Sequence, residues 1–198
     1  VDDMTFDVRS AGPPDGPLVM LLHGFPQTSF EWRAQLEALG EAGYYVVAPN
    51  QRGYSPGARP SEEAAYALPL LAGDVLAMAD ALGHEKFHLV GHDWGAGVTW
   101  ATAIFAPDRL LSVTSVSIPH PDAFNAELMD MESCQYSASS YFDFFAAEGS
   151  EDTLLADDAA ILKSIYGDLE PEAIDDYLSV LGTPEALGAA LDWYRANI

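Results

Sequence analysis

The stretch HLVGHDWGAG, residues 88–97, decides the fold of this 198-residue chain. A short apolar run leads into a turn that begins at Gly91 and ends at Gly95, and a helix-forming run, Ala96–Ala106, follows. A strand that passes into a helix through so tight a turn lifts the side chain at the centre of the turn above the sheet. That central residue is Asp93, so the sequence predicts a raised carboxylate at the end of a strand.

Strand and helix patterns alternate over the first 120 residues. Leu18–Leu22 is a continuous apolar run of the kind buried in a parallel sheet. Ser29 is expected to cap the first helix. The residues expected in strands are Thr5–Arg9, Leu18–Leu22, Tyr44–Ala48, Phe87–Val90 and Leu110–Ile118, and those expected in helices are Ser29–Gly43, Leu68–Gly83 and Ala96–Ala106. This alternation predicts an α/β fold, with a mostly parallel sheet and helices on both faces.

The pattern changes after Pro119, where only helical segments follow. They are Ala123–Met131, Tyr141–Glu148, Asp157–Ile165, Pro171–Leu181 and Glu185–Arg195. A helical insert after a strand at the carboxyl edge of a parallel sheet lies over the ligand crevice as a lid. We therefore expect two parts, a core at residues 1–120 and a helical cap at residues 121–198.

The composition excludes several classes of partner. Acidic residues number 31 and basic residues 8, for a net charge of −23, which argues against nucleic acids and anionic membranes. This acidity indicates either a strongly solvated surface or adaptation to high salt. No apolar run is long enough to span a membrane, the first residues show no secretory signal, and one cysteine, Cys134, fits a reducing compartment. We expect a cytoplasmic protein with no zinc-like ligand spacing.

Two further motifs follow apolar strands. His23-Gly24-Phe25-Pro26 comes directly after Leu18–Leu22, and a loop rich in glycine and proline, Asn50–Pro60, comes after the next strand. With the turn around Asp93, they resemble the epoxide hydrolase branch of the α/β-hydrolases, close to the haloalkane and haloacetate dehalogenases. The resemblance covers nearly the whole chain and is carried by His23-Gly24-Phe25-Pro26, Arg52-Gly53-Tyr54-Ser55, Gly91-His92-Asp93-Trp94-Gly95 and Leu191-Asp192-Trp193-Tyr194-Arg195.

The resemblance implies a role for the carboxylate. Asp93 would attack an sp³ carbon and form an alkyl-enzyme ester, which water then hydrolyses at the carboxyl carbon of the aspartate. The backbone N–H groups of Phe25 and Trp94 would form the oxyanion hole for that second step. Pro26 and Trp94 would contact the substrate. Neither a metal nor an organic cofactor is expected.

The helical segment separates the alternatives. Epoxide opening leaves an alkoxide that needs a proton donor, and the resemblance implies Tyr141 and Tyr194 for this role. Asp192 stands where the family usually has asparagine. A dehalogenase would instead need indole N–H donors for a halide, and Trp94 and Trp193 are candidates. The third reading is an inactive protein of this fold that binds a small apolar ligand. The expected partner is accordingly a small epoxide or organohalide.

Part of the usual catalytic triad is missing from the sequence. The fold places an acid after the helical segment and a histidine after the last strand, and neither appears before Ile198. Asp122 is the only carboxylate near the alternative acid position and is a weak candidate. His23 is expected to support the oxyanion loop, and His92 to point away from the nucleophile. We expect the chain to be part of a longer hydrolase, or else to have a partner or second copy covering its sheet edge, and not to turn over alone.

Overall fold

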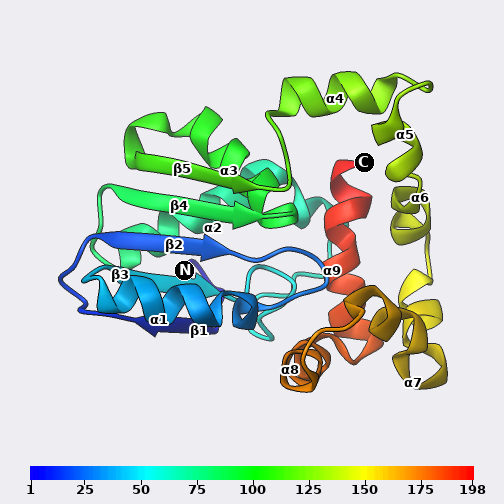
Figure 1. The fold of residues 1–198 in the computed structure, drawn as a ribbon, viewed down its shortest axis with the longest axis horizontal. Coiled ribbons are helices and arrows are strands. Elements are labelled where there is room, and N and C mark those ends of the chain that lie inside the picture. The colour runs from blue at the N-terminus through cyan, green and yellow to red at the C-terminus, as the bar shows by residue number, and fades with distance from the viewer.

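A computed structural model describes residues 1–198 and contains one five-stranded sheet (Figure 1). The strands are β1 (Val8–Ala11), β2 (Leu18–Leu22), β3 (Tyr45–Pro49), β4 (Phe87–His92) and β5 (Leu110–Val116), in the order β1-β3-β2-β4-β5. Strands β2 to β5 pair in parallel, whereas β1 runs antiparallel to β3. The mostly parallel sheet is confirmed, but the first strand spans Val8–Ala11 rather than Thr5–Arg9.

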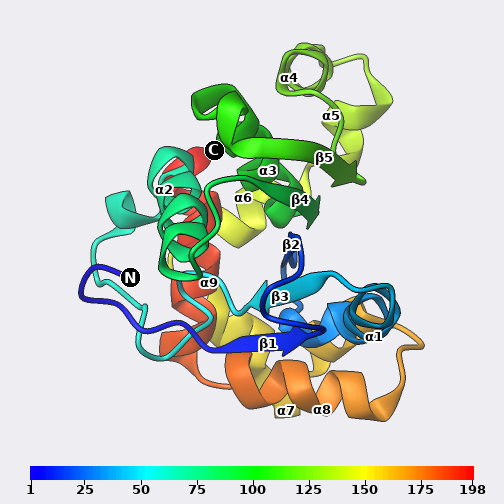
Figure 2. The same ribbon diagram turned by 90° about the vertical axis from the view of Figure 1, so that its left-hand side faces the viewer.

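Helices cover both faces of the sheet, as expected (Figure 2). They are α1 (Arg33–Glu41) on one face, and α2 (Leu68–Ala81) and α3 (Trp94–Phe105) on the other. Side chains of a strand alternate between the two faces. On β2, Val19 and Leu21 join the small core beside α1, whereas Met20 and Leu22 join the large core beneath α2 and α3.

The start of the first helix differs from the prediction. A short 3₁₀ turn, Ser29–Trp32, precedes α1, and its cap is Thr28, whose hydroxyl accepts the Phe30 N–H at 3.2 Å. Ser29 lies inside the turn instead of capping it, and is buried. Thr28 and Ser29 are adjacent and both can cap a helix, so the sequence alone does not distinguish them. In the structure, the 3₁₀ turn places the cap one residue earlier than expected.

All elements after β5 are helical, and they gather beyond the carboxyl ends of the parallel strands, with α9 next to those ends (Figure 1). The helices are α4 (Pro121–Met129), α5 (Cys134–Ala138), α6 (Tyr141–Ala146), α7 (Ser150–Tyr166), α8 (Pro171–Leu181) and α9 (Pro184–Asn197). The short α5 was not predicted, and α7 begins earlier than expected and is broken at Ala156–Ala159. None of the helices has the length and apolar character needed to cross a membrane.

Long-range hydrogen bonds tie this helical segment to the loops of the sheet. The Trp193 indole N–H donates to the carbonyl of Arg52 at 2.9 Å, and the Tyr166 hydroxyl donates to the carbonyl of Pro26 at 2.9 Å. Both contacts join α7 or α9 to a loop that follows a parallel strand. The helical segment is thereby held directly over the carboxyl edge of the sheet.

Strand β5 forms one edge of the sheet and is apolar there. Leu111 is 53% exposed, and Val113 and Val116 are also exposed. A strand edge of this kind offers unpaired backbone groups to another chain. Whether copies of the chain associate stays a prediction.

Candidate active site

Asp93 lies in a strained turn between β4 and α3. Its backbone has φ +51° and ψ −122°, a conformation that residues other than glycine rarely adopt. The flanking glycines make the turn sterically feasible. A Cβ atom at Gly91 would lie 2.1 Å from the carbonyl oxygen of Gly95, and one at Gly95 would lie 2.2 Å from the carbonyl oxygen of Leu22. The Gly-x-Asp-x-Gly pattern is therefore a packing requirement of the raised carboxylate.

The loop after β2 closes over this carboxylate. A Cβ atom at Gly24 would lie 2.4 Å from the Cβ of Asp93, so only glycine allows so close an approach. The Phe25 N–H donates to Oδ1 of Asp93 at 2.9 Å, and the Trp94 N–H also donates to this carboxylate. Both N–H groups expected from the sequence are thus brought to Asp93. Burial raises the pKa of Asp93, and these two hydrogen bonds oppose the rise without cancelling it.

The two tyrosines reach Asp93 from separate helices. Tyr194 on α9 is 2% exposed, and its ring packs edge-to-face against Trp94 at 5.0 Å and Phe25 at 5.4 Å between centroids. Tyr141, the first residue of α6, is 42% exposed. Partial burial and then the charge of Asp93 raise the pKa of Tyr141 to about 12, and the same causes raise the pKa of Tyr194 well above its usual range. Both phenols therefore stay protonated at neutral pH.

Two cavities meet at these three residues. Asp93, Tyr141 and Tyr194 line both a cavity of about 320 Å³ and a second cavity of about 330 Å³. Of the other residues expected to contact substrate, Trp94 lines the first cavity and Pro26 the second. The structure thus brings together the complete set of candidate site residues inferred from the sequence. Their chemical roles stay a prediction.

Several lining residues were not inferred from the sequence. They are Trp100, Phe124, Asn125, Gln135, Phe142 and Asn197 in the first cavity, and Phe145 and Ile165 in the second. A signal existed for two positions on α3. Gly97 and Trp100 follow Asp93 by four and seven residues, so they share one face of the helix with it. The remaining residues depend on how α4 to α7 and α9 pack, which no motif encodes.

The loop motif Arg52-Gly53-Tyr54-Ser55 supports the site from behind. The Arg52 guanidinium donates to both carboxylate oxygens of Asp74 on α2, at 2.6 and 2.8 Å. Gly53 has φ +88°, and a Cβ atom there would lie 2.7 Å from the carbonyl oxygen of Ala189 on α9. The buried ring of Tyr54 packs against that of His23 at 4.4 Å. The motif thus connects α2, α9 and the loop after β2.

The histidines lie outside both cavities. His23 is completely buried; its Nε2 accepts the Gln51 N–H at 3.2 Å and its Nδ1 lies 3.0 Å from the carbonyl oxygen of Gly24. Burial lowers the pKa of His23 to about 4, so its ring is neutral and supports the loop as expected. His92 pairs with Glu31 at 2.8 Å, a contact that raises its pKa. The side chain of Asp122 is 94% exposed and lines neither cavity.

Comparisons with known proteins agree with this arrangement. Residues 17–179 match the family model described as alpha/beta hydrolase fold. The chain is 34% identical over 207 residues to AB hydrolase superfamily protein YfhM of Bacillus subtilis, an alignment that covers 98% of this chain and 70% of the relative. It is 37% identical over 166 residues to Epoxide hydrolase A of Mycobacterium tuberculosis, covering 83% of this chain and 52% of that protein.

The same likeness holds in three dimensions. The structure superimposes on a Bacillus megaterium epoxide hydrolase in complex with an inhibitor with a TM-score of 0.87 and 28% identity, covering 98% of this chain and 69% of that one. The chain therefore belongs to the α/β-hydrolase fold family. Within the family, its relatives and structural neighbours place it on the epoxide hydrolase branch. The chain spans about half the length of Epoxide hydrolase A.

Proposed function

We propose that this chain carries the epoxide-opening half of an epoxide hydrolase, with Asp93 as the nucleophile. The observation that carries the proposal is the meeting of one carboxylate and two phenols at the junction of two cavities. The carboxylate already accepts hydrogen bonds from the Phe25 and Trp94 N–H groups. The helical segment, residues 121–198, acts as the cap that brings the phenols to the site.

In the first step, a carboxylate oxygen of Asp93 attacks a carbon of the epoxide ring. The C–O bond of the ring breaks, and its electron pair moves to the ring oxygen. Tyr141 or Tyr194 then donates its phenolic proton to this alkoxide. The products are an alcohol on an Asp93 ester and a tyrosinate, which regains a proton from solvent.

The charges in the site support proton transfer at this moment. The negative charge of Asp93 contributes to the raised pKa values of both tyrosines. Ester formation neutralises that charge, so this contribution is lost as the alkoxide forms. The phenols therefore become stronger acids when their protons are needed, and remain weak acids in the resting site.

In the second step, water attacks the carboxyl carbon of the ester, and the N–H groups of Phe25 and Trp94 stabilise the oxyanion. A base must activate that water. His23, which is part of the loop that carries Phe25, is buried and already bonded to the backbone, and no histidine lines either cavity. We therefore expect this 198-residue chain to accumulate the ester rather than to release diol.

The dehalogenase alternative is less well supported. It needs indole N–H groups that face a departing halide. The indole N–H of Trp193 is buried and donates to the carbonyl of Arg52, so it is not available to a ligand. Trp100 also lines the first cavity, but its indole N–H donates to the carbonyl of Ile118 at 3.2 Å, so Trp94 is the remaining candidate donor there. The pair of tyrosines, in contrast, matches the proton requirement of an epoxide.

The test is the intact mass of the chain before and after incubation with styrene oxide, followed by peptide mapping. Cys134 is exposed and is a competing nucleophile, so only the peptide that contains Asp93 is scored. We expect one stable adduct on Asp93 and none in the Asp93→Asn variant. A folded chain with no Asp93 adduct would overturn the proposal. Halide release from phenacyl bromide without any reaction with the epoxide would favour the dehalogenase, and reversible binding alone would favour the inactive protein.

A further inference from the structure

The two tyrosines of the site belong to different helices, so a tertiary contact must set their separation. Tyr194 lies on α9, and Tyr141 is the first residue of α6. Two phenols that share one epoxide oxygen must hold their hydroxyl groups within hydrogen-bond reach of it. The structure places a single polar cluster between α9 and the turn after α6, centred on the side chain of Arg195.

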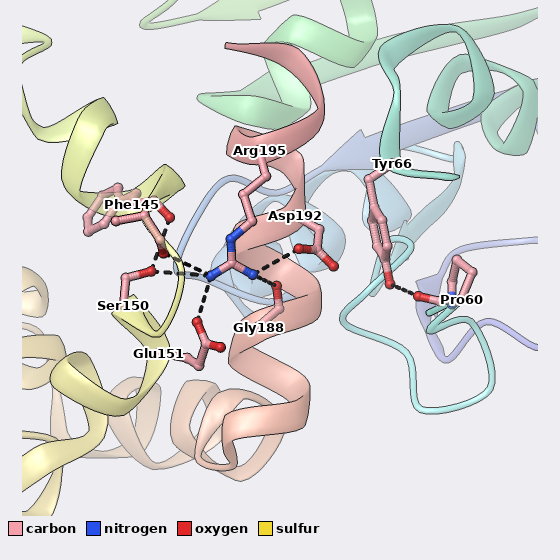
Figure 3. Close-up of polar contacts among 9 residues, drawn as sticks. Pro60, Tyr66, Phe145, Ser150, Glu151, Gly188, Asp192 and Arg195 are labelled. Atoms are coloured by element: carbon pink, nitrogen blue, oxygen red, sulfur yellow. Dashed lines mark hydrogen bonds and ion pairs between the residues drawn. The ribbon is translucent and has the colours of Figure 1, made fainter. Parts of the chain in front are cut away.

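The Arg195 guanidinium joins the two segments (Figure 3). Its Nη2 donates to the carbonyl oxygen of Ala147 at 3.2 Å, to Oγ of Ser150 at 3.4 Å and to Oε2 of Glu151 at 2.6 Å. Ala147 directly follows α6, and Ser150 and Glu151 are the first two residues of α7, so residues 147–151 form the α6–α7 turn. Its Nη1 donates within α9, to Oδ1 of Asp192 at 2.9 Å and to the carbonyl oxygen of Gly188 at 3.5 Å.

Packing carries this contact from the turn to the tyrosines. The Ser150 hydroxyl donates to the carbonyl of Phe145 at 3.2 Å, which ties the end of α6 to the turn. The Phe145 ring packs edge-to-face against Tyr141 at 5.3 Å and against Tyr194 at 5.1 Å. A displacement of the turn would therefore move a ring that contacts both tyrosines.

The charges make Arg195 hard to replace. Residues 121–198 contain 17 acidic residues but two basic ones, Lys163 and Arg195. The Arg195 side chain is 15% exposed. The two carboxylates that it contacts are also largely buried, with Glu151 at 21% and Asp192 at 17% exposed. Solvent screens such a pair less than a surface pair. Without the cation, the two carboxylates would face each other across the contact and repel.

We propose that Arg195 is a positioning residue that sets the spacing of Tyr141 and Tyr194 above Asp93. This inference rests on the proposed function, because it concerns the donors of that reaction. It also gives Asp192 a role, since the Asp192 carboxylate orients the guanidinium on α9.

The test compares two electrophiles. Styrene oxide needs a proton at its leaving oxygen, whereas phenacyl bromide loses bromide and needs none, although both alkylate a carboxylate. Rates of Asp93 adduct formation are measured for the wild type and for Arg195→Met over a range of electrophile concentrations. We expect the maximal rate with the epoxide to fall about 10-fold or more, and that with the bromide to change less than about twofold. The half-saturating concentration should stay unchanged.

Four further variants keep the test decisive. Arg195→Lys retains the charge but not the planar fork, so it should recover part of the epoxide rate. Adding Glu151→Gln to Arg195→Met should also recover part of it, because the repulsion is relieved. Lys163→Met removes an exposed cation of the same segment and should behave like the wild type. If Arg195→Met does not fold, Glu151→Gln alone should lower the rate of Asp93 adduct formation with the epoxide by a smaller factor, and should leave the rate with the bromide unchanged.

The failures can be told apart. If Arg195→Met slows adduct formation equally with both electrophiles, the positioning role is overturned. Arg195 would then only stabilise the fold. Unchanged epoxide rates in folded Arg195→Met would overturn the positioning role as well. A wild-type chain that forms no Asp93 adduct with the epoxide would instead overturn the proposed function, whatever the variants do.

Discussion

The indole N–H of Trp193 donates to the backbone carbonyl of Arg52 at 2.9 Å, inside the core and away from the cavities. This bond joins α9 to the loop after β3. It has two consequences. The helix that carries Tyr194 is anchored to the sheet by the residue next to that tyrosine, and the best second donor for a halide is already occupied.

We expect Trp193→Phe to destabilise the chain without weakening halide binding. The change leaves the Arg52 carbonyl without its partner and a small void in place of the indole, at a cost of about 2–4 kcal/mol. Urea unfolding measures this loss as a lower midpoint at constant slope. Bromide titration followed by tryptophan fluorescence provides the second readout. A variant of normal stability that binds bromide more weakly would contradict this role and revive the dehalogenase.

The tyrosines give the second prediction. Tyr141→Phe and Tyr194→Phe should each slow alkylation of Asp93 by styrene oxide about 10-fold to 100-fold, and the double variant should lose about 100-fold to 10,000-fold, because no phenol is left to protonate the alkoxide. Alkylation by phenacyl bromide should hardly change. Tyr136→Phe is the matched control, since Tyr136 is exposed and lies outside both site cavities. Equal losses with both electrophiles would mean that the phenols only shape the cavity.

Asp93→Asn should abolish the adduct and stabilise the fold. Burial raises the folded-state pKa of Asp93 above its unfolded value, so the ionised carboxylate costs stability at neutral pH. Asparagine tolerates positive φ and keeps the Phe25 hydrogen bond. We expect a gain of about 1 kcal/mol, or about 2–4 °C in Tm, that shrinks as the pH falls toward about 4. Asp158→Asn, at an exposed carboxylate that Lys163 stabilises, should show no gain.

Steric necessity explains which parts of the fold could be predicted from the sequence. The turn at Asp93 requires Gly91 and Gly95, because any Cβ there would collide with backbone. The buried β2 was placed correctly since a run of five apolar residues is too short for a typical helix and fits a strand covered on both faces. The bounds of α8 were correct because Pro171 starts the helix and Gly182 follows its last residue.

The elements that were missed lack such signals. Helix α5 has five residues, Cys134–Ala138, which is too short for a helical period to show. The break in α7 places Asp157, Asp158 and Ala159 at positive φ, and no glycine at these positions indicates it in the sequence. The cavity walls depend on packing between helices, and the Arg195 cluster depends on where the α6–α7 turn lies. These features follow from tertiary contacts that motifs do not record.

The pH dependence of alkylation should have one acid limb, from Asp93, and none from histidine. The rate should fall as acid protonates Asp93, whose pKa burial raises above its usual range, and it should be flat from about pH 7 to about pH 10. The pKa of Tyr141 is about 12, so this phenol stays protonated throughout that range. The acid limb should be shared by both electrophiles, whereas a loss at high pH should affect the epoxide alone. Loss of activity through pH 6.5 with a normal fold would implicate a histidine instead.

His23 should make the fold sensitive to acid. Its Nε2 accepts the Gln51 N–H, and Nδ1 lies 3.0 Å from the Gly24 carbonyl oxygen, an arrangement that only the neutral ring satisfies. Burial lowers its folded-state pKa to about 4, below the unfolded value, so the unfolded chain takes up the proton first. The free energy of unfolding should therefore fall as the pH drops from about 6.5 to about 4, by up to about 3 kcal/mol from this residue.

Urea unfolding at about pH 7 and about pH 4.5 measures the effect, since this interval crosses the unfolded-state pKa of His23 and stays above its folded-state pKa. His23→Gln can keep one donor and one acceptor but cannot take up the proton. It should therefore be less stable than the wild type at neutral pH, by about 1–2 kcal/mol, and lose less stability on acidification. His120→Gln removes an exposed histidine and should retain the wild-type difference between the two pH values. An identical acid loss in His23→Gln would assign the sensitivity to other groups, because the buried imidazole would then contribute nothing to it.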